Sequence, residues 1–374
     1  MDVAAAIPPA DTERAELAWL QALAEPYLRI HDVTVGAMDG RALRLRGELR
    51  STSDELYAAL APAVRAHGRT LLLREDEGLV AVLALRGVMR PKANNRWLPI
   101  VLAVLTFCSM VFSYAAMHAS AESITWAAIE DGLGDALAFT VSLLTILVAH
   151  ELGHYVVARR LGVAVTLPYL IPMPLSLFGT MGALIQIKDI PPNRRAMLLI
   201  GAAGPLAGLA VGVPILALGI ALSVVNALPS GTGYLMEGNS LLYAVLKYAI
   251  KGEWLPSATR DIMLHPVAMS GWAGLLVTSF NLVPAGQLDG GHVATALLGH
   301  RSRNLTWAVI VILLLMGGLW RGWWLWAALA FLSSRVRVEP LDSVTDLTPR
   351  QRRLAVILLL LAIVTFTPIP VRFL

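Results

Sequence analysis

Residues 133–160 read LGDALAFTVSLLTILVAHELGHYVVARR, an apolar run that ends in two arginines. As a helix this run can cross roughly 30 Å of hydrocarbon, since each helical residue rises about 1.5 Å. Near its end stand His150, Glu151 and His154. Ionisable side chains are costly in an apolar span unless they are paired or bind a metal. The stretch therefore predicts a transmembrane helix that carries a chemical site.

His150, Glu151 and His154 form the pattern H-E-x-x-H. Residues four apart share one face of a helix, so both imidazoles can reach one ion at roughly 2.0–2.1 Å while Glu151 stands beside it. Zinc in such a site lowers the pKa of a bound water toward about 7, and a neighbouring carboxylate can take the proton. A chance match between two hydrogen-bonded core histidines is the alternative, and the apolar surroundings count against it.

Two histidines leave a tetrahedral zinc ion one protein ligand short, with the last position kept for water. Asp289 is the candidate, within the stretch NLVPAGQLDGG that begins at Asn281. Pro284 and Gly286 interrupt the helix there, and non-helical backbone at membrane depth is tolerated only where it is buried in protein or lines a wet cavity. A helix-ending residue before a glycine pair is the alternative interpretation of Asp289.

Composition indicates a membrane protein, because 56% of the 374 residues are apolar, 15% are charged, and the mean hydropathy is +0.65. The net charge of +4 does not indicate nucleic-acid binding, since the basic residues fall in short loops between apolar runs. Cys108 has no second cysteine to pair with, so neither a disulfide nor thiolate chemistry is expected. Residues 1–30 predict no cleavable signal peptide.

The first part of the chain has the pattern of a small soluble α+β domain, over residues 1–92. A helix is predicted at 53–67, and strands are predicted at 41–49, 69–75 and 79–86. These residues carry no functional motif.

Basic residues in the loops predict the topology. Arg90, Lys92 and Arg96 precede the first apolar run, at 97–117, so the N-terminal domain is expected in the cytoplasm. The loop at 118–132 has no Lys or Arg, and the second run ends in two arginines. The H-E-x-x-H site is therefore expected at the cytoplasmic end of its helix.

Further apolar runs predict about seven transmembrane helices in all, at 196–225, 266–288, 305–320, 322–333 and 354–369. Asp289 then lies at the depth of the H-E-x-x-H site. His292 competes with it as a ligand, whereas His265 belongs at the opposite membrane face. The tryptophans of this region are expected to form an interfacial aromatic belt. They are Trp320, Trp323, Trp324 and Trp326.

The pairing of H-E-x-x-H with a later N-x-x-P-x-x-x-L-D-G resembles the site-2 protease family of intramembrane metalloproteases. The resemblance covers roughly residues 97–300. It implies that His150, His154 and Asp289 bind zinc. It also implies that Glu151 is the catalytic base and that Asn281 holds the substrate or the oxyanion. A plain hydrogen bond between helices is the alternative role of Asn281.

Two other segments fit the resemblance. Residues 178–188 are β-leaning and too short to span, and in the family a comparable membrane-dipping hairpin lies beside the active site, where its edge could pair with an unwound substrate. A mere connector is the alternative. Gly204 and Gly208 form a G-x-x-x-G step that predicts close helix packing. The loop after the third span, about 40 residues long, has no room for a PDZ domain.

These features predict an all-α polytopic membrane protein with about seven transmembrane helices, a membrane-associated β-hairpin and a small N-terminal α+β domain. Its expected parts are a cytoplasmic domain at 1–92, a catalytic membrane core at 97–300 and additional helices at 301–374. The expected enzyme is a zinc metalloendopeptidase of the bilayer that cuts transmembrane protein substrates on the cytoplasmic side.

Two other classes of function compete with this prediction. In a divalent-metal transporter, the same residues would line an ion path, but neither motif has a second copy as an internal repeat would require. In a silent scaffold, a structural zinc site would not need the base Glu151.

Overall fold

The computed structural model describes residues 10–88, 95–118, 126–228, 235–336 and 339–373, and the chain divides into two compact units. The N-terminal unit comprises the chain up to Lys92 together with two later segments, Asp189–Met197 and Glu339–Thr348. The membrane unit comprises the rest. Two residues of the predicted cytoplasmic flank, Arg90 and Lys92, and residues 119–125 of the predicted outer loop lie outside the described ranges.

A four-stranded antiparallel sheet, in the order β1-β2-β4-β3, forms the N-terminal unit together with its helices. The elements are α1 (Ala10–Ala24), β1 (Leu28–Gly36), α2 (Ala37–Gly40), β2 (Ala42–Leu49), α3 (Ser53–Ala66), β3 (Arg69–Asp76) and β4 (Leu79–Arg86). The predicted helix and all three predicted strands are confirmed. Helix α1 and strand β1 were not predicted from the sequence.

Helix α3 shows how the sequence determines this unit. The Thr52 hydroxyl accepts a hydrogen bond from the Glu55 amide at 3.3 Å and so caps the helix. Its residues Leu56, Leu60 and Val64 recur on one face and are fully buried. They join leucines of α1 and of the sheet in one hydrophobic core.

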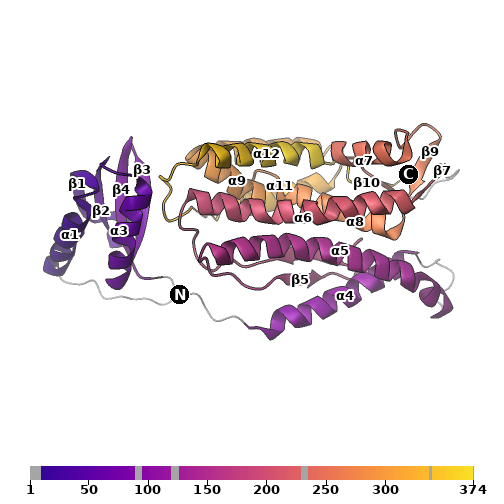
Figure 1. Cartoon of the computed structure of the whole chain (residues 1–374), viewed down its shortest axis with the longest axis horizontal. Helices are drawn as coiled ribbons and strands as arrows, with labels where there is room; N and C mark the ends of the chain where they lie inside the picture. Colours follow the sequence, from indigo (N-terminus) through magenta and orange to yellow (C-terminus); the bar gives the residue numbers. More distant parts are fainter. Residues whose placement is uncertain (1–9, 89–94, 119–125, 229–234, 337–338, 374) are drawn as a thin grey trace. The chain divides into compact units, whose positions relative to one another are not determined.

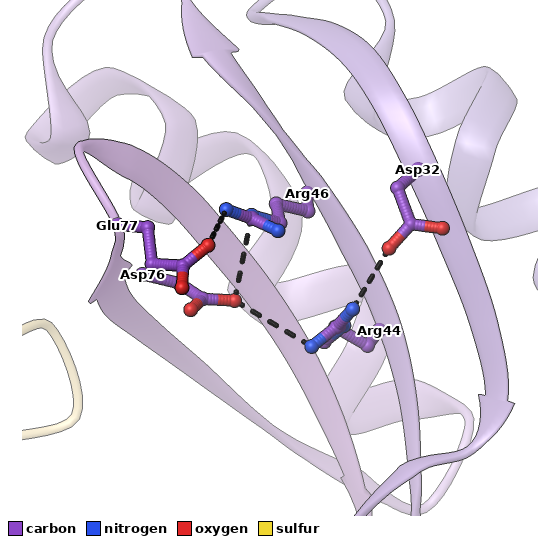
Figure 2. Close-up of polar contacts among 5 residues, drawn as sticks. All are labelled: Asp32, Arg44, Arg46, Asp76 and Glu77. Carbon is purple, nitrogen blue, oxygen red and sulfur yellow. Dashed lines mark hydrogen bonds and ion pairs between the residues drawn. The ribbon is translucent and has the colours of Figure 1, made fainter.

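The opposite face of the sheet carries a network of two arginines and three acidic side chains, shown in Figure 2. Arg44 pairs with Asp32 at 2.7 Å, Arg46 pairs with Glu77 at 2.8 Å, and both guanidinium groups lie 3.5 Å from Asp76. These side chains are partly exposed, and ion pairs in solvent contribute only about 0–1 kcal/mol each. The network is therefore a solvated surface that adds little to the stability of the sheet.

Three helices of the membrane unit are long and apolar enough to cross a membrane, a count made only over the described ranges. They are α4 (Trp97–His118), α5 (Trp126–Arg160) and α6 (Arg194–Leu222), which run lengthwise through this unit in Figure 1. Each coincides with a predicted span. The chain is a membrane protein by this criterion, whereas the count of seven spans stays a prediction.

Shorter helices occupy the remaining apolar runs. They are α7 (Leu241–Lys251), α8 (Pro266–Asn281), α9 (Asp289–Leu298), α10 (Ser302–Met316), α11 (Gly322–Ser334) and α12 (Pro349–Thr365), with a 3-10 turn at Gly299–Arg301. Helix α8 occupies only the first part of the predicted fourth span, at 266–288, and α9 begins at the residue after it.

Three two-stranded sheets complete the membrane unit: β5 (Tyr169–Pro172) with β6 (Thr180–Leu184), β7 (Val224–Ala227) with β9 (Arg260–Met263), and β8 (Leu235–Glu237) with β10 (Val371–Phe373). The β5–β6 hairpin contains the first half of the predicted β stretch. It is tied to α4 because the hydroxyls of Ser109 and Ser113 donate to the carbonyls of Gly179 and Pro174, at 2.6 and 2.7 Å.

Trp323 lies in the core of the membrane unit. Its ring stacks on Phe366 with centroids 4.9 Å apart, meets Phe280 edge-on, and donates from Nε1 to the Pro368 carbonyl at 2.7 Å. The predicted interfacial belt is therefore wrong for this tryptophan, which is fully buried. A buried indole needs a hydrogen-bond acceptor, and the chain supplies one here.

Alkaline pH is predicted to destabilise the N-terminal unit through Tyr57. Burial of the Tyr57 hydroxyl, with a smaller contribution from the Asp342 carboxylate, raises its pKa from 10.0 to about 12. Because the folded pKa lies above the unfolded one, the stabilisation is complete below about pH 10 and is lost as pH rises toward 12. The difference between ultraviolet titrations of the wild type and Tyr57→Phe should show one phenol ionising near 12. An ordinary midpoint, near 10, would contradict this placement of Tyr57.

Candidate metal centre

The last turns of α5 carry the H-E-x-x-H residues. The side chains of His150, Glu151 and His154 are all buried. The two imidazoles lie on one side of the helix, with ring centroids 5.1 Å apart. The four-residue spacing therefore produces the shared face that the sequence predicted.

Asp289, the first residue of α9, meets both imidazoles. Its Oδ2 lies 3.1 Å from His150 Nε2 and 3.2 Å from His154 Nε2. Ligand atoms at roughly 2.0–2.1 Å from a tetrahedral zinc ion are about 3.3 Å apart, close to these separations. The three residues also have ligand atoms that lie within 4.8 Å of one another, and no other such group occurs among the residues described. The donor set therefore fits a zinc-sized divalent cation.

A non-helical connector between α8 and α9 turns Asp289 toward α5. Helix α8 ends at Asn281, and α9 begins only at Asp289. Between them Gly286 has φ +57°, and a Cβ atom there would overlap the hydroxyl of Ser333 on α11. That hydroxyl accepts a hydrogen bond from the Gln287 amide at 3.4 Å. The predicted interruption at this stretch is confirmed, and α11 supports it.

Hydrogen bonds orient the two imidazoles differently. His154 donates from Nδ1 to the carbonyl of Ile200 at 2.7 Å, which directs its Nε2 toward Asp289. His150 Nδ1 is buried and has no hydrogen-bond partner in the described part of the chain. The amide nitrogen of Asn281 lies 3.4 Å from His150 Nε2. Asn281 thus lies at the edge of the centre.

Helix α6 approaches α5 closely through its glycines. A Cβ atom at Gly204 would overlap the ring of His154, and one at Gly208 would lie 2.9 Å from His150 Nδ1. In the other direction, a Cβ at Gly153 of α5 would overlap the Ala203 carbonyl. The predicted G-x-x-x-G step is thus a packing contact made directly on the two histidines.

Glu151 does not belong to the group of three ligand atoms. The backbone of Ile185, immediately after β6, hydrogen-bonds to its carboxyl group. The catalytic candidate on α5 is therefore linked to the β5–β6 hairpin.

The competing histidines do not join the centre. His265 caps α8 by accepting a hydrogen bond on Nδ1 from the Val267 amide at 3.3 Å. His292 follows Asp289 by one helical turn, near Gly201, and lies outside the group of ligand atoms. The structure brings Asp289, and neither of these two, to the H-E-x-x-H face.

The backbone partners of the centre carry no signal in the sequence. The Ile200 carbonyl and the Ile185 backbone belong to groups that every residue has, so no residue type marks them. The glycines of α6 were visible as a pattern, but their contact with the imidazoles was not.

The H-E-x-x-H motif lies on a helix of a membrane protein, and an aspartate distant in sequence joins it. This arrangement is typical of the metal site of a membrane metallopeptidase. The family model of peptidase family M50 matches residues 138–318, which contain the whole centre. Over these residues the chain is similar to this family, the site-2 protease family.

The curated relatives that match this chain are named as probable zinc metalloproteases. The chain is 32% identical over 252 residues to probable zinc metalloprotease EGY2, chloroplastic, of Arabidopsis thaliana, which covers 66% of this chain and 43% of the relative. It is 33% identical over 243 residues to EGY1 of the same plant, covering 63% and 43%. For EGY2 of Oryza sativa subsp. indica the identity is 29% over 311 residues, covering 81% and 56%. The chain thus spans about half the length of these relatives, and no solved structure matches it.

Gly204→Ala is predicted to weaken metal binding. The added methyl group would overlap the His154 ring and displace a ligand, so metal affinity should fall roughly 10- to 100-fold, as for a lost supporting contact. Gly212→Ala is the matched control on the same helix, because its Cβ would only touch Ile146 at 3.4 Å. Metal content of the purified proteins, measured by mass spectrometry, checks this. Equal metal content in both variants would show that α6 does not pack closely against the histidines.

Proposed function

We propose that the chain is an intramembrane zinc metalloprotease that hydrolyses peptide bonds in or near transmembrane segments of membrane-protein substrates. The observation that supports this best is the convergence of His150, His154 and Asp289 beside Glu151, on a helix long and apolar enough to span a bilayer. The match to peptidase family M50, and the similarity to relatives named zinc metalloproteases, support both the metal and the reaction.

In this proposal His150, His154 and Asp289 would hold the zinc ion. When bound, zinc polarises the scissile carbonyl and makes the attacking water more acidic. Glu151 accepts the proton of that water and delivers it to the leaving amine. Asn281, whose amide nitrogen is 3.4 Å from His150 Nε2, donates a hydrogen bond to the substrate carbonyl oxygen as charge develops there.

The substrate must present an unwound segment, because a helical peptide bond is shielded by its own hydrogen bonding and side chains. Strand β6 pairs with β5 alone among the described strands, so the backbone groups of its other edge have no strand partner there and could pair with an extended chain. The residue after β6, Ile185, hydrogen-bonds to the Glu151 carboxyl group. We propose that substrate backbone pairs with β6 and so reaches the base.

The proposed topology follows the loop charges. The N-terminal domain, at residues 1–92, and the active site face the cytoplasm, the catalytic core occupies 97–300, and the helices of 301–374 bring the number of spans to about seven. A transporter is not favoured, since the family and the relatives are those of metalloproteases.

Replacement of the base separates binding from chemistry. Glu151→Gln keeps the size of the side chain but cannot accept the proton, so zinc content should be unchanged while cleavage falls at least roughly 10²–10⁴-fold. The measurement compares both proteins in proteoliposomes that contain a single-span model substrate.

Asp135→Asn is the matched control, because Asp135 is an exposed acidic residue on the same helix. It should cleave like the wild type. Equal cleavage by Glu151→Gln and the wild type would exclude Glu151 as the base.

A further inference from the structure

A cavity of about 280 Å³ lies in the membrane unit, at the end away from α9 in Figure 1. Its walls come from β7, β8 and β9, from the first turns of α8 and from the last turn of α4. All the residues that line it are apolar except Glu237 and Asp261. The volume lies just below the range of small-molecule sites, roughly 300–1,000 Å³, so the cavity suits one long side chain better than a larger molecule.

Glu237, on β8, has its counter-charge within the protein. The Tyr243 hydroxyl donates to Glu237 Oε1 at 3.0 Å, and Lys247 Nζ lies 3.7 Å from the same oxygen. The Lys247 side chain is fully buried, and its ammonium group lies 4.5 Å from the centroid of the Tyr243 ring. A buried charge is tolerated when it is paired. Lys247 and Glu237 therefore balance each other.

Asp261, on β9, has no such counter-charge. It is only 8% exposed and lines the cavity, and its Oδ1 accepts the Ile262 amide at 2.8 Å. Oδ2 has neither a hydrogen bond nor an ion pair within the described ranges. The neighbouring cation, Arg260, pairs instead with Glu253 at 3.2 Å. Because a buried carboxylate without a cation is costly, the cavity favours a positively charged occupant.

Methionines form an adaptable part of the apolar wall. The cavity is lined by Met117, Met236, Met263 and Met269. Thioether side chains are flexible and polarizable, so they fit apolar groups of different shape. A lysine or arginine side chain has an apolar stem and a charged end, and it needs an apolar wall beside a carboxylate. The cavity provides both.

The strands around the cavity favour a peptide as the source of this side chain. Strand β8 pairs with β10, and β7 pairs with β9, so the other edge of each has no strand partner in the described part of the chain. An extended peptide can pair with such an edge through its backbone and place alternate side chains in pockets. A lipid headgroup has no peptide backbone to pair in this way. A basic residue in an extended peptide therefore fits the cavity best.

Helix α8 connects the cavity with the metal centre. Met269, near its start, lines the cavity, and Asn281, at its end, lies 3.4 Å from His150 Nε2. These two positions are 12 residues apart, or about 18 Å of helix. About 12 helical residues or about six extended residues of a bound peptide cover the same length. One substrate chain can therefore occupy both places at once.

We propose that the cavity is a substrate subsite in which Asp261 binds a lysine or arginine side chain, roughly six to 12 residues from the scissile bond. This inference rests on the proposed function. Asp261 contributes to binding alone, so it selects the substrate and leaves the chemical step unchanged.

Peptide binding to the full-length protein in detergent tests the subsite without any cleavage. The probe is a soluble, fluorescein-labelled hexapeptide of alanine and leucine with one central arginine, and a second peptide has norleucine in its place. By fluorescence anisotropy the wild type should bind the arginine peptide about tenfold more tightly, as a hydrogen bond to a charged group would give. Asp261→Asn keeps the shape of the side chain and the acceptor for the Ile262 amide but removes the charge. It should bind both peptides equally.

Glu253→Gln is the matched control, because Glu253 is an acidic residue near β9 that pairs with Arg260 and does not line the cavity. It should keep the wild-type preference for the arginine peptide.

Cleavage in proteoliposomes gives the second readout. With a single-span substrate that carries one arginine about six to 12 residues from the scissile bond, Asp261→Asn should raise KM about tenfold at unchanged kcat. Removal of that arginine from the substrate should raise the KM of the wild type by the same factor and leave that of Asp261→Asn unchanged.

Equal affinity of the wild type for the two peptides, or an undiminished arginine preference in Asp261→Asn, would overturn the proposal. Phosphatidylethanolamine that remained bound during purification and that the arginine peptide did not displace would also overturn it, because the cavity would then hold a lipid amine. If the protein bound the arginine peptide through Asp261 but cleaved no substrate, the proposed function would fail and the basic-peptide site would stand.

Discussion

Three ionisable side chains buried on one apolar helix are the constraint that the fold must satisfy. His150, Glu151 and His154 lose hydration in the membrane unit, and such groups are tolerated when they are paired or bind a metal. The carboxylate of Asp289, shared between the two imidazoles, meets this need for the histidines. A cation at the centre would neutralise the carboxylate and occupy both imidazole nitrogens, so binding and burial favour the same arrangement.

Much of the surrounding structure follows from bringing that carboxylate to α5. The helix is interrupted between α8 and α9, and the Ser333 hydroxyl of α11 accepts a hydrogen bond from this connector. Helix α6 must be narrow where it crosses the histidines, which explains Gly204 and Gly208. The Ile200 carbonyl then directs one imidazole. Packing, backbone geometry and the metal centre are therefore parts of one arrangement.

The sequence predicted the elements whose signals are local. The period of α3, the apolar runs of α4 to α6 and the Pro284 interruption depend on residue type and spacing, and they are confirmed. The approach of Asp289 to both histidines was predicted from motif and topology together. Backbone acceptors such as Ile200, and the docking of residues 339–348 on β3, depend on tertiary pairing that no residue type encodes. Trp323 was placed at an interface because its neighbours share its chemistry, although only it is fully enclosed.

X-ray absorption at the zinc edge of the purified protein tests the central claim most directly. The shared centre predicts two imidazole nitrogens and light oxygen ligands at roughly 2.0–2.2 Å, with no sulfur. In Asp289→Ala the protein oxygen should disappear from this shell, and zinc should be held more weakly. An unchanged spectrum and affinity in that variant would show that Asp289 is not a ligand, and the account of one cation shared by α5 and α9 would be wrong.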